Sequence, residues 1–232
     1  MLKACLNGGR RRDEHPAVPV TPAELAADAA RCAALGAAAV HVHPRDATGA
    51  ESLAPAVIAE AVTALRAAGL PVGVSTGAWI EPDPVARVAA VRAWPVLPDF
   101  VSVNAHEPGA EAVAAALHER GVLVEAGLWT VAAVEAWRGW RVPAGRILVE
   151  CTPDDPVTAL ADAAAILAAL APGGPPVLLH GEGAAAWPVL AEAVRRRLDT
   201  RIGLEDTLRL SDGTPTPDNP TLVDAALTLG AA

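Results

Sequence analysis

Eight short runs of β-forming residues alternate with eight runs of helical pattern, and most of the connections between them are only a few residues long. This alternation predicts parallel βα units. The expected strands are residues 2–6, 38–43, 71–75, 100–104, 122–126, 146–151, 176–180 and 200–205. The expected helices are residues 22–35, 53–68, 83–93, 109–119, 129–138, 155–170, 184–197 and 217–229.

Residues with known preferences for helix ends support several of these boundaries. The Thr21-Pro22-Ala23-Glu24 segment is a capping box with proline at the first helical position, and Asp154-Asp155-Pro156 precedes the sixth helix. Gly36 and Gly69 stand where the first two helices should stop.

This order of elements is compatible with two α/β folds, an open doubly wound sheet and a closed (β/α)8 TIM barrel. No expected strand is followed by the Gly-x-Gly-x-x-Gly pattern that is typical of the doubly wound dinucleotide-binding fold. Eight units without that pattern favour the barrel. We therefore expect a single (β/α)8 barrel domain over residues 1–232.

Composition excludes several classes of function. A net charge of -9, with six Trp, one Phe and no Tyr, argues against binding nucleic acid. Three cysteines without a Cys-x-x-Cys spacing indicate a reducing compartment. Because the start does not resemble a signal peptide and no apolar run has the length of a membrane span, we expect a cytoplasmic protein without a membrane partner.

The segment His41-Val42-His43 is the first candidate for chemistry. On a strand, two histidines two residues apart project from the same face, where both imidazoles can reach one ion such as zinc. A third ligand must then come from elsewhere in the chain. A pair of histidines satisfied by hydrogen bonds in a core or cleft is an equally good interpretation of the spacing alone.

Polar residues stand at the carboxyl end of every expected strand. In a barrel these ends form one ring, where the active sites of the fold lie. Strand ends are generally more polar than strand middles, which would produce part of this pattern. The residues are Asn7, His41 with His43, Ser75-Thr76-Gly77, Asn104, Glu125, Glu150, His180 with Glu182, and Glu205-Asp206.

The last strand and the first loop carry further charged candidates. If the last strand is extended through Glu205, Arg201 lies about 13 Å below it, at roughly 3.3 Å per residue. An ion pair inside the barrel is then one interpretation of Arg201. The loop with Arg10, Arg11, Arg12, Asp13 and Glu14 is either a solvated charged loop or a cover over the site that binds a carboxylate or phosphate.

Five segments in order along the chain resemble motifs of the β-keto acid cleavage enzyme family. They are Asn-Gly-Gly at 7–9, Pro-Ala-Val-Pro-Val-Thr-Pro-Ala-Glu at 16–24, His-Val-His-Pro-Arg-Asp at 41–46, Val-Ser-Thr-Gly at 74–77 and Arg-Ile-Gly-Leu-Glu-Asp-Thr-Leu at 201–208. The resemblance implies a zinc-bearing barrel that reacts a β-keto acid with the co-substrate acetyl-CoA and yields acetoacetate and a new acyl-CoA.

The same resemblance implies roles for individual residues. The metal ligands would be His41, His43 and Glu205, and the catalytic pair that removes the C2 proton would be Arg201 and Asp206. Substrate-binding residues would be Ser75, Thr76, Gly77, Asn104, Glu125 and Glu14. Independently of the resemblance, the position of Arg45 and Asp46 just after the histidines indicates either a pair that orients the histidines or a salt bridge within the loop. Barrels of this kind commonly associate, so we expect a homo-oligomer.

Two other functions remain open at this point. One is a metal-dependent hydrolase or aldolase of small keto acids that does not use CoA. The other is a non-catalytic, metal-dependent carboxylate-binding protein.

Overall fold

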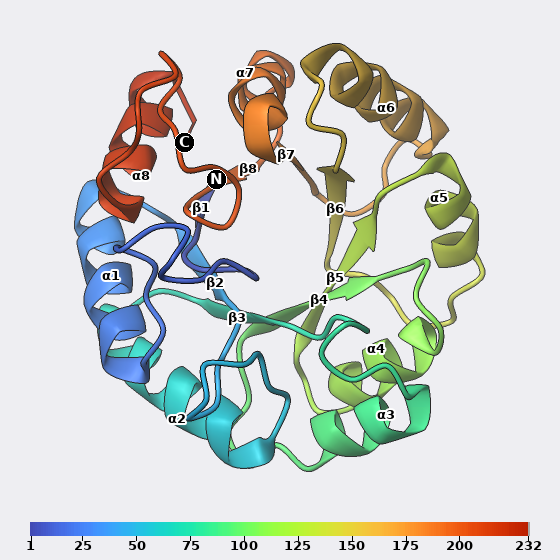
Figure 1. Cartoon of the computed structure of the whole chain (residues 1–232). Coiled ribbons are helices and arrows are strands. Elements are labelled where there is room, and N and C mark those ends of the chain that lie inside the picture. The colour runs from blue at the N-terminus through green and yellow to red at the C-terminus, as the bar shows by residue number, and fades with distance from the viewer. Residues whose placement is uncertain (232) are drawn as a thin grey trace.

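The computed structural model describes residues 1–231, in which eight parallel strands form a ring surrounded by eight α-helices (Figure 1). The strands are β1 (Leu2–Cys5), β2 (Ala39–Val42), β3 (Val72–Ser75), β4 (Phe100–Asn104), β5 (Leu123–Leu128), β6 (Arg146–Cys151), β7 (Val177–Gly181) and β8 (Thr200–Ile202). The helices are α1 (Pro22–Leu35), α2 (Pro55–Leu65), α3 (Pro84–Arg92), α4 (Ala110–His118), α5 (Val131–Arg138), α6 (Pro156–Ala169), α7 (Ala186–Arg196) and α8 (Asn219–Thr228), with short 3-10 turns η1 (Arg66–Ala68) and η2 (Gly183–Ala185).

The strands are ordered β7-β6-β5-β4-β3-β2-β1-β8, so the first strand lies between the second and the last. The ring is closed between β7 and β8 by Asp199, whose carbonyl accepts a hydrogen bond from Leu179 N at 2.9 Å, and by Thr200, whose hydroxyl donates to Leu179 O at 2.8 Å. The predicted α/β fold, a (β/α)8 barrel, is confirmed.

The helix ends follow the signals in the sequence. Thr21 Oγ1 accepts from Glu24 N at 3.3 Å and Glu24 Oε2 accepts from Thr21 N at 2.9 Å, which completes the capping box. Gly36 and Gly69 end α1 and η1 with φ of 115° and 71°, in the left-handed region that glycine adopts without a steric penalty.

The last strand is shorter than expected, and the prediction that it is extended through Glu205 was wrong. The chain turns at Gly203, whose carbonyl accepts from Asp206 N at 2.9 Å and Thr207 N at 3.0 Å. A Cβ atom at Gly203 would lie 1.8 Å from Cys5 O, so only glycine permits this approach to β1. Leu204 N is held by Asn219 Oδ1 at 2.7 Å.

The fifth strand continues two residues beyond its expected end. It runs to Leu128, and Glu125 therefore lies within the strand, beside Arg146 at the start of β6. The expectation that Glu125 stands at a carboxyl strand end was wrong. In the sequence, an acidic residue within an apolar strand looks like the end of that strand. Its ion-pair partners, Lys3 and Arg146, are distant in the sequence and cannot be identified from neighbouring residues.

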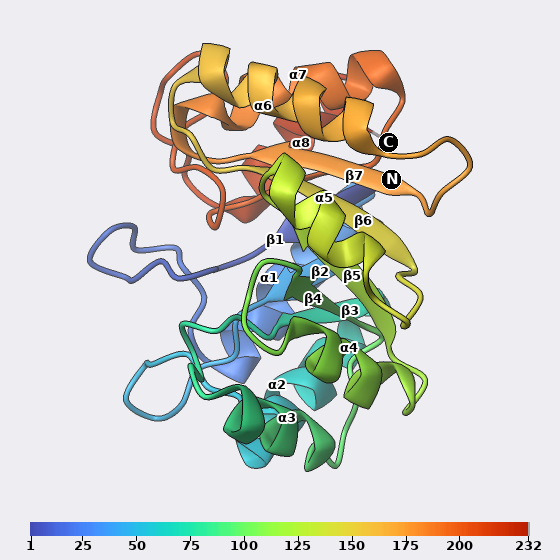
Figure 2. The same cartoon turned by 90° about the vertical axis from the view of Figure 1, so that its right-hand side faces the viewer.

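The long connections after β1 and β2 project to the same side of the barrel, opposite the N-terminus (Figure 2). This is the carboxyl end of the strands, where the active sites of this fold lie. Among the α-helices of residues 1–231, none combines the length and the apolar character needed to cross a membrane.

Candidate metal centre and active-site cavity

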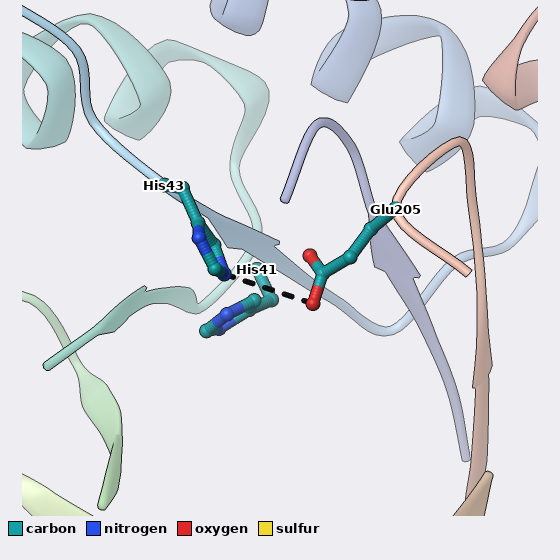
Figure 3. Close-up of side chains that lie close together, drawn as sticks. All are labelled: His41, His43 and Glu205. Carbon is teal, nitrogen blue, oxygen red and sulfur yellow. Dashed lines mark ion pairs between the residues drawn. The ribbon is translucent and has the colours of Figure 1, made fainter. Parts of the chain in front are cut away.

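His41, His43 and Glu205 lie together at the carboxyl end of the barrel, and their side chains point toward one another (Figure 3). His41 belongs to β2, His43 follows its last residue, and Glu205 lies in the turn after β8. One donor atom from each side chain lies within 4.8 Å of the other two, and His43 Nε2 is 3.7 Å from Glu205 Oε1. The strand spacing and the turn at Gly203 together produce a group with the donor atoms that zinc prefers.

The charge states of His41 and Glu205 suit a cation. Burial lowers the pKa of His41 well below its usual value, so its ring is neutral and can donate a lone pair. Burial would raise the pKa of Glu205, but Arg201 and the two histidines outweigh it and hold that pKa well below the usual range. Glu205 Oε2 is buried without a hydrogen-bond partner. The donor set therefore fits a divalent metal ion.

His43 is held in place from three sides. Its Nδ1 is hydrogen-bonded to Glu51 Oε1, its backbone N–H and carbonyl are bonded at 2.9 Å to the side-chain amide of Asn7, and Trp79 stacks on its ring with centroids 6.1 Å apart. Burial opposes a positive charge on His43, but Glu205 and Glu51 outweigh it and raise the pKa of the imidazole to about 9. A metal ion at Nε2 would replace that proton.

Glu51 was missed by the sequence analysis, which considered Arg45 and Asp46 in that place. Arg45 instead donates to the carbonyls of Gly8 and Arg10 at 2.7 Å, and Asp46 accepts from Thr48 within its own turn. Within residues 1–231, neither side chain is hydrogen-bonded to His41 or His43, and the two side chains form no salt bridge with each other. The expectation for Arg45 and Asp46 was wrong.

Arg201 and Asp206 form the expected pair. Arg201 Nη2 lies 2.8 Å from Asp206 Oδ1 and 2.9 Å from Glu205 Oε1, because the turn after β8 brings both carboxylates back over the strand. The predicted separation of about 13 Å is wrong for this reason. Burial raises the pKa of Asp206 well above its usual value, and Glu205 adds to this effect. Asp206 Oδ2 is buried without a partner.

The buried ring of His180 lies between Asp206 and Glu150, and neither of its nitrogens has a hydrogen-bond partner. His180 Nδ1 is 3.8 Å from Asp206 Oδ1 and His180 Nε2 is 3.5 Å from Glu150 Oε2. Burial lowers the pKa of His180 well below its usual value. Burial and the neighbouring Glu150 raise the pKa of Glu182 to about 7. Glu182 is therefore about half ionised at pH 7.

Of the Ser75-Thr76-Gly77 segment, expected to hold the substrate carboxylate, and of Asn104, also expected to bind substrate, two residues line the cavity. These are Ser75 and Asn104. The hydroxyl of Thr76 donates to Ser102 O at 2.7 Å, and Gly77 N donates to Ser75 Oγ at 3.3 Å. Asn104 Nδ2 donates to Glu107 Oε1 at 2.9 Å. These hydrogen bonds hold the side chains in place, and Ser75 and Asn104 are the two that line the cavity.

The two remaining predicted residues are placed differently. Glu14 lines the cavity, where Arg10 Nη1 is 3.0 Å from its Oε1. Glu125 is not among the lining residues. It is fully buried, with Lys3 Nζ 2.5 Å from Oε2 and Arg146 Nη1 2.8 Å from Oε1. Both oxygens of Glu125 are thus engaged in an ion-pair cluster inside the barrel.

The metal-site cavity has a volume of about 490 Å³ and is rich in carboxyl groups. Five glutamates and two arginines line it, together with His41, His43 and several neutral residues. The charged residues are Glu14, Glu51, Glu150, Glu182 and Glu205, with Arg10 and Arg201. The volume is in the range of cavities that bind small organic molecules.

Comparison with known proteins gives one family and one fold. A model of the beta-keto acid cleavage enzyme family matches residues 1–232. No curated protein matches. Among solved structures, apo ObcA shares 16% identity at a TM-score of 0.72, covering 94% of this chain, which spans 63% of ObcA. The type I 3-dehydroquinate dehydratase of Clostridium difficile shares 9% identity at a TM-score of 0.60, covering 99% of this chain and 91% of that one. These structural similarities concern the fold alone.

Proposed function

The chain belongs to the beta-keto acid cleavage enzyme family, and on that premise we propose that it is a zinc-dependent enzyme that reacts a β-keto acid with acetyl-CoA. The products would be acetoacetate and the acyl-CoA of the remaining acyl group. The observation that carries this proposal is the convergence of His41, His43 and Glu205 on one point of the cavity.

Three protein ligands leave positions for substrate oxygens, as in catalytic zinc sites. A zinc ion held there would withdraw charge from the keto oxygen and make the C2 protons of the substrate more acidic. His41 and His43 would supply neutral nitrogens and Glu205 a charged oxygen. Glu51 would fix the ring of His43 so that Nε2 faces the ion.

Asp206 would accept the C2 proton. An ordinary aspartate is a weak base for this task. Burial raises the pKa of Asp206, which makes its carboxylate a stronger base toward the C2 proton. Asp206 is fully buried and is not among the lining residues of the cavity, but its partner Arg201 is. Oδ2, which has no partner, would take the proton, while Arg201 holds Oδ1. Ser75 and Asn104, which line the cavity, would orient the substrate carboxylate.

The remaining steps follow from the chemistry of the two substrates. The C2 carbanion forms a bond to the acetyl carbonyl carbon of acetyl-CoA. The CoA thiolate is transferred to the former keto carbon, and the bond between that carbon and C2 breaks. Acetoacetate retains C2 and the carboxylate and takes back at C2 the proton that Asp206 had accepted. The acyl group leaves as its CoA thioester, so atoms and electrons balance without an added oxidant or reductant.

The test is acetoacetate release from acetyl-CoA and a panel of β-keto acids, read together with zinc content. Wild-type protein should contain about one zinc per chain and form acetoacetate only when both substrates are present. His41→Ala protein should lose zinc and activity together. Asp206→Asn protein should retain zinc and lose activity by about 10²- to 10⁴-fold.

Other outcomes point to other functions. Zinc-free His41→Ala protein with full activity would overturn the proposal. Keto-acid turnover that does not depend on acetyl-CoA would indicate a hydrolase or an aldolase. Metal-dependent ligand binding without turnover would indicate a carboxylate-binding protein.

A further inference from the structure

A second cavity, of about 500 Å³, adjoins the metal-site cavity at the same end of the barrel. Arg10 lines both cavities. The chain also passes from one cavity to the other at two further points, after β7 from Glu182 to Gly183 and after β8 from Glu205 to Thr207. The two cavities are therefore neighbouring compartments separated by Arg10 and the two segments that follow β7 and β8.

The two compartments have opposite electrostatic character. The metal-site cavity carries five glutamates against two arginines, whereas the second cavity is lined by Arg10, Arg209 and one acidic residue, Asp154. Asp154 Oδ1 accepts a hydrogen bond from Ala184 N, in η2, at 2.6 Å. This bond partly offsets the negative charge of Asp154. An anion is favoured in the second cavity over the first.

Arg209 is available for such an anion. It is exposed, its Nη1 donates to Gly213 O at 2.8 Å, and no carboxylate of residues 1–231 lies within ion-pair distance of it. Its backbone is fixed at the same time, because Trp187 Nε1 donates to Arg209 O at 2.8 Å. Guanidinium groups of this kind bind phosphate strongly.

Part of the lining of the second cavity is apolar. Trp187 is 92% buried, and Pro188, Leu208 and Leu210 line the cavity beside it. A chain of methylene and amide groups can lie against such a wall while its anionic end reaches Arg209. The second cavity thus suits a long ligand that is apolar in its middle and anionic at its far end.

We propose that the second cavity binds the pantetheine arm and the phosphates of the CoA thioester, with the acetyl group passing Arg10 into the metal-site cavity. This inference rests on the proposed function, which requires a thioester beside the metal. It assigns the keto acid to the acidic compartment and the CoA moiety to the basic one. Arg209 is then a binding residue for the phosphates and has no part in the chemistry.

The test compares acetyl-CoA with acetyl-N-acetylcysteamine, a short thioester that lacks the phosphates, in wild-type, Arg209→Gln and Arg209→Glu protein. Gln keeps a donor for Gly213 O and removes the charge, which separates loop support from anion binding. Arg66→Glu is the matched control, because Arg66 is also exposed and also donates to a backbone carbonyl, that of Leu97, but follows α2 at the opposite end of the barrel.

Arg209→Glu should raise the KM for acetyl-CoA about tenfold or more, the loss expected for one charge-assisted contact. The kcat, the zinc content and the KM for the short thioester should stay within about twofold of wild type. CoA binding measured by calorimetry should weaken in parallel. Arg66→Glu should leave every one of these values unchanged.

Two results would overturn the inference while leaving the proposed function intact. One is acetoacetate formation with an acetyl-CoA KM that Arg209→Glu does not alter. The other is an equal rise in KM for both thioesters. Wild-type protein that binds CoA through Arg209 but releases no acetoacetate would contradict the proposed function and support the assignment of the cavity.

Discussion

The Nδ1 atom of His43 is hydrogen-bonded to Oε1 of Glu51, eight residues further along the chain. This contact fixes the ring so that Nε2 faces Glu205 at 3.7 Å. Glu51 Oε2 also accepts from Trp79 Nε1 at 3.0 Å, which ties the carboxylate to the ring that stacks on His43. Glu51 is therefore the residue that orients one metal ligand.

Glu51→Gln should weaken zinc binding by about 10- to 100-fold, because the neutral amide holds the imidazole less firmly and lowers its basicity. Competition with a chromogenic chelator measures this. Glu60→Gln, an exposed change on α2, is the control and should bind zinc as wild type does. Equal zinc affinity in both variants would show that Glu51 does not support the metal site.

Glu125→Gln should destabilise the fold by about 3–5 kcal/mol, because it leaves Lys3 and Arg146 beside a neutral group inside the barrel. Urea unfolding measures the change. Glu14→Gln removes a pair whose carboxylate is 39% exposed and should cost less than about 1 kcal/mol. A raised substrate KM with unchanged stability in Glu125→Gln would favour the substrate role implied by the family resemblance.

Gly8→Ala should weaken zinc binding, because an added Cβ would lie 2.4 Å from Glu205 Cγ and displace that ligand. Gly8 also has a φ of 51°, so backbone strain of about 1–2 kcal/mol accompanies the collision. Gly121→Ala separates the two effects, since Gly121 has a φ of 80° with nothing within 4 Å of the added atom. Both variants should lose stability in urea, and only Gly8→Ala should lose zinc affinity.

Glu182→Gln should stabilise the metal-free protein at alkaline pH. Burial and Glu150 raise the pKa of Glu182 in the folded state to about 7, so the stability due to its protonated form is present below pH 4.5 and is lost as pH rises through 7. The variant should exceed wild type by up to about 3 kcal/mol at pH 8 and match it near pH 4.5. Urea unfolding across this range measures the difference.

Glu192→Gln is the control for that experiment, because the pKa of Glu192 is shifted in the opposite direction to that of Glu182. Two arginines lower the pKa of Glu192 to about 2, so its contribution is lost only as pH falls below its unfolded value. The stability difference between Glu192→Gln and wild type should stay constant from pH 6 to 8. A Glu182→Gln difference that is equally constant would contradict the raised pKa.

Periodicity predicted the barrel and the two histidines because both depend on local spacing. His41 and His43 share a face for the same reason that β2 is a strand, and the capping residues of α1 act within one turn. Glu51 could not be predicted this way. It reaches His43 because an antiparallel bridge with Arg45 folds the connecting loop back on itself.

Glu205 and Glu125 were misplaced along their strands for a different reason. The turn after Ile202 depends on the approach of Gly203 to Cys5, and the burial of Glu125 depends on Lys3, far away in the sequence. Glu205 nevertheless lies beside His41 and His43 as predicted, because a tight turn and an extended strand both leave it at the carboxyl end of the barrel. Contacts between distant residues decided these details.

The place of β1 between β2 and β8 has a consequence for how the protein assembles. The histidines precede Glu205 by most of the length of the chain. β2, which presents the histidines, is the next strand after β1, whereas β8, which precedes Glu205, pairs with β1 only when the last strand is in place. A half-formed barrel would therefore have no metal site. A bound ion would link the early and late parts of the chain, and its binding free energy would add to the free energy of unfolding.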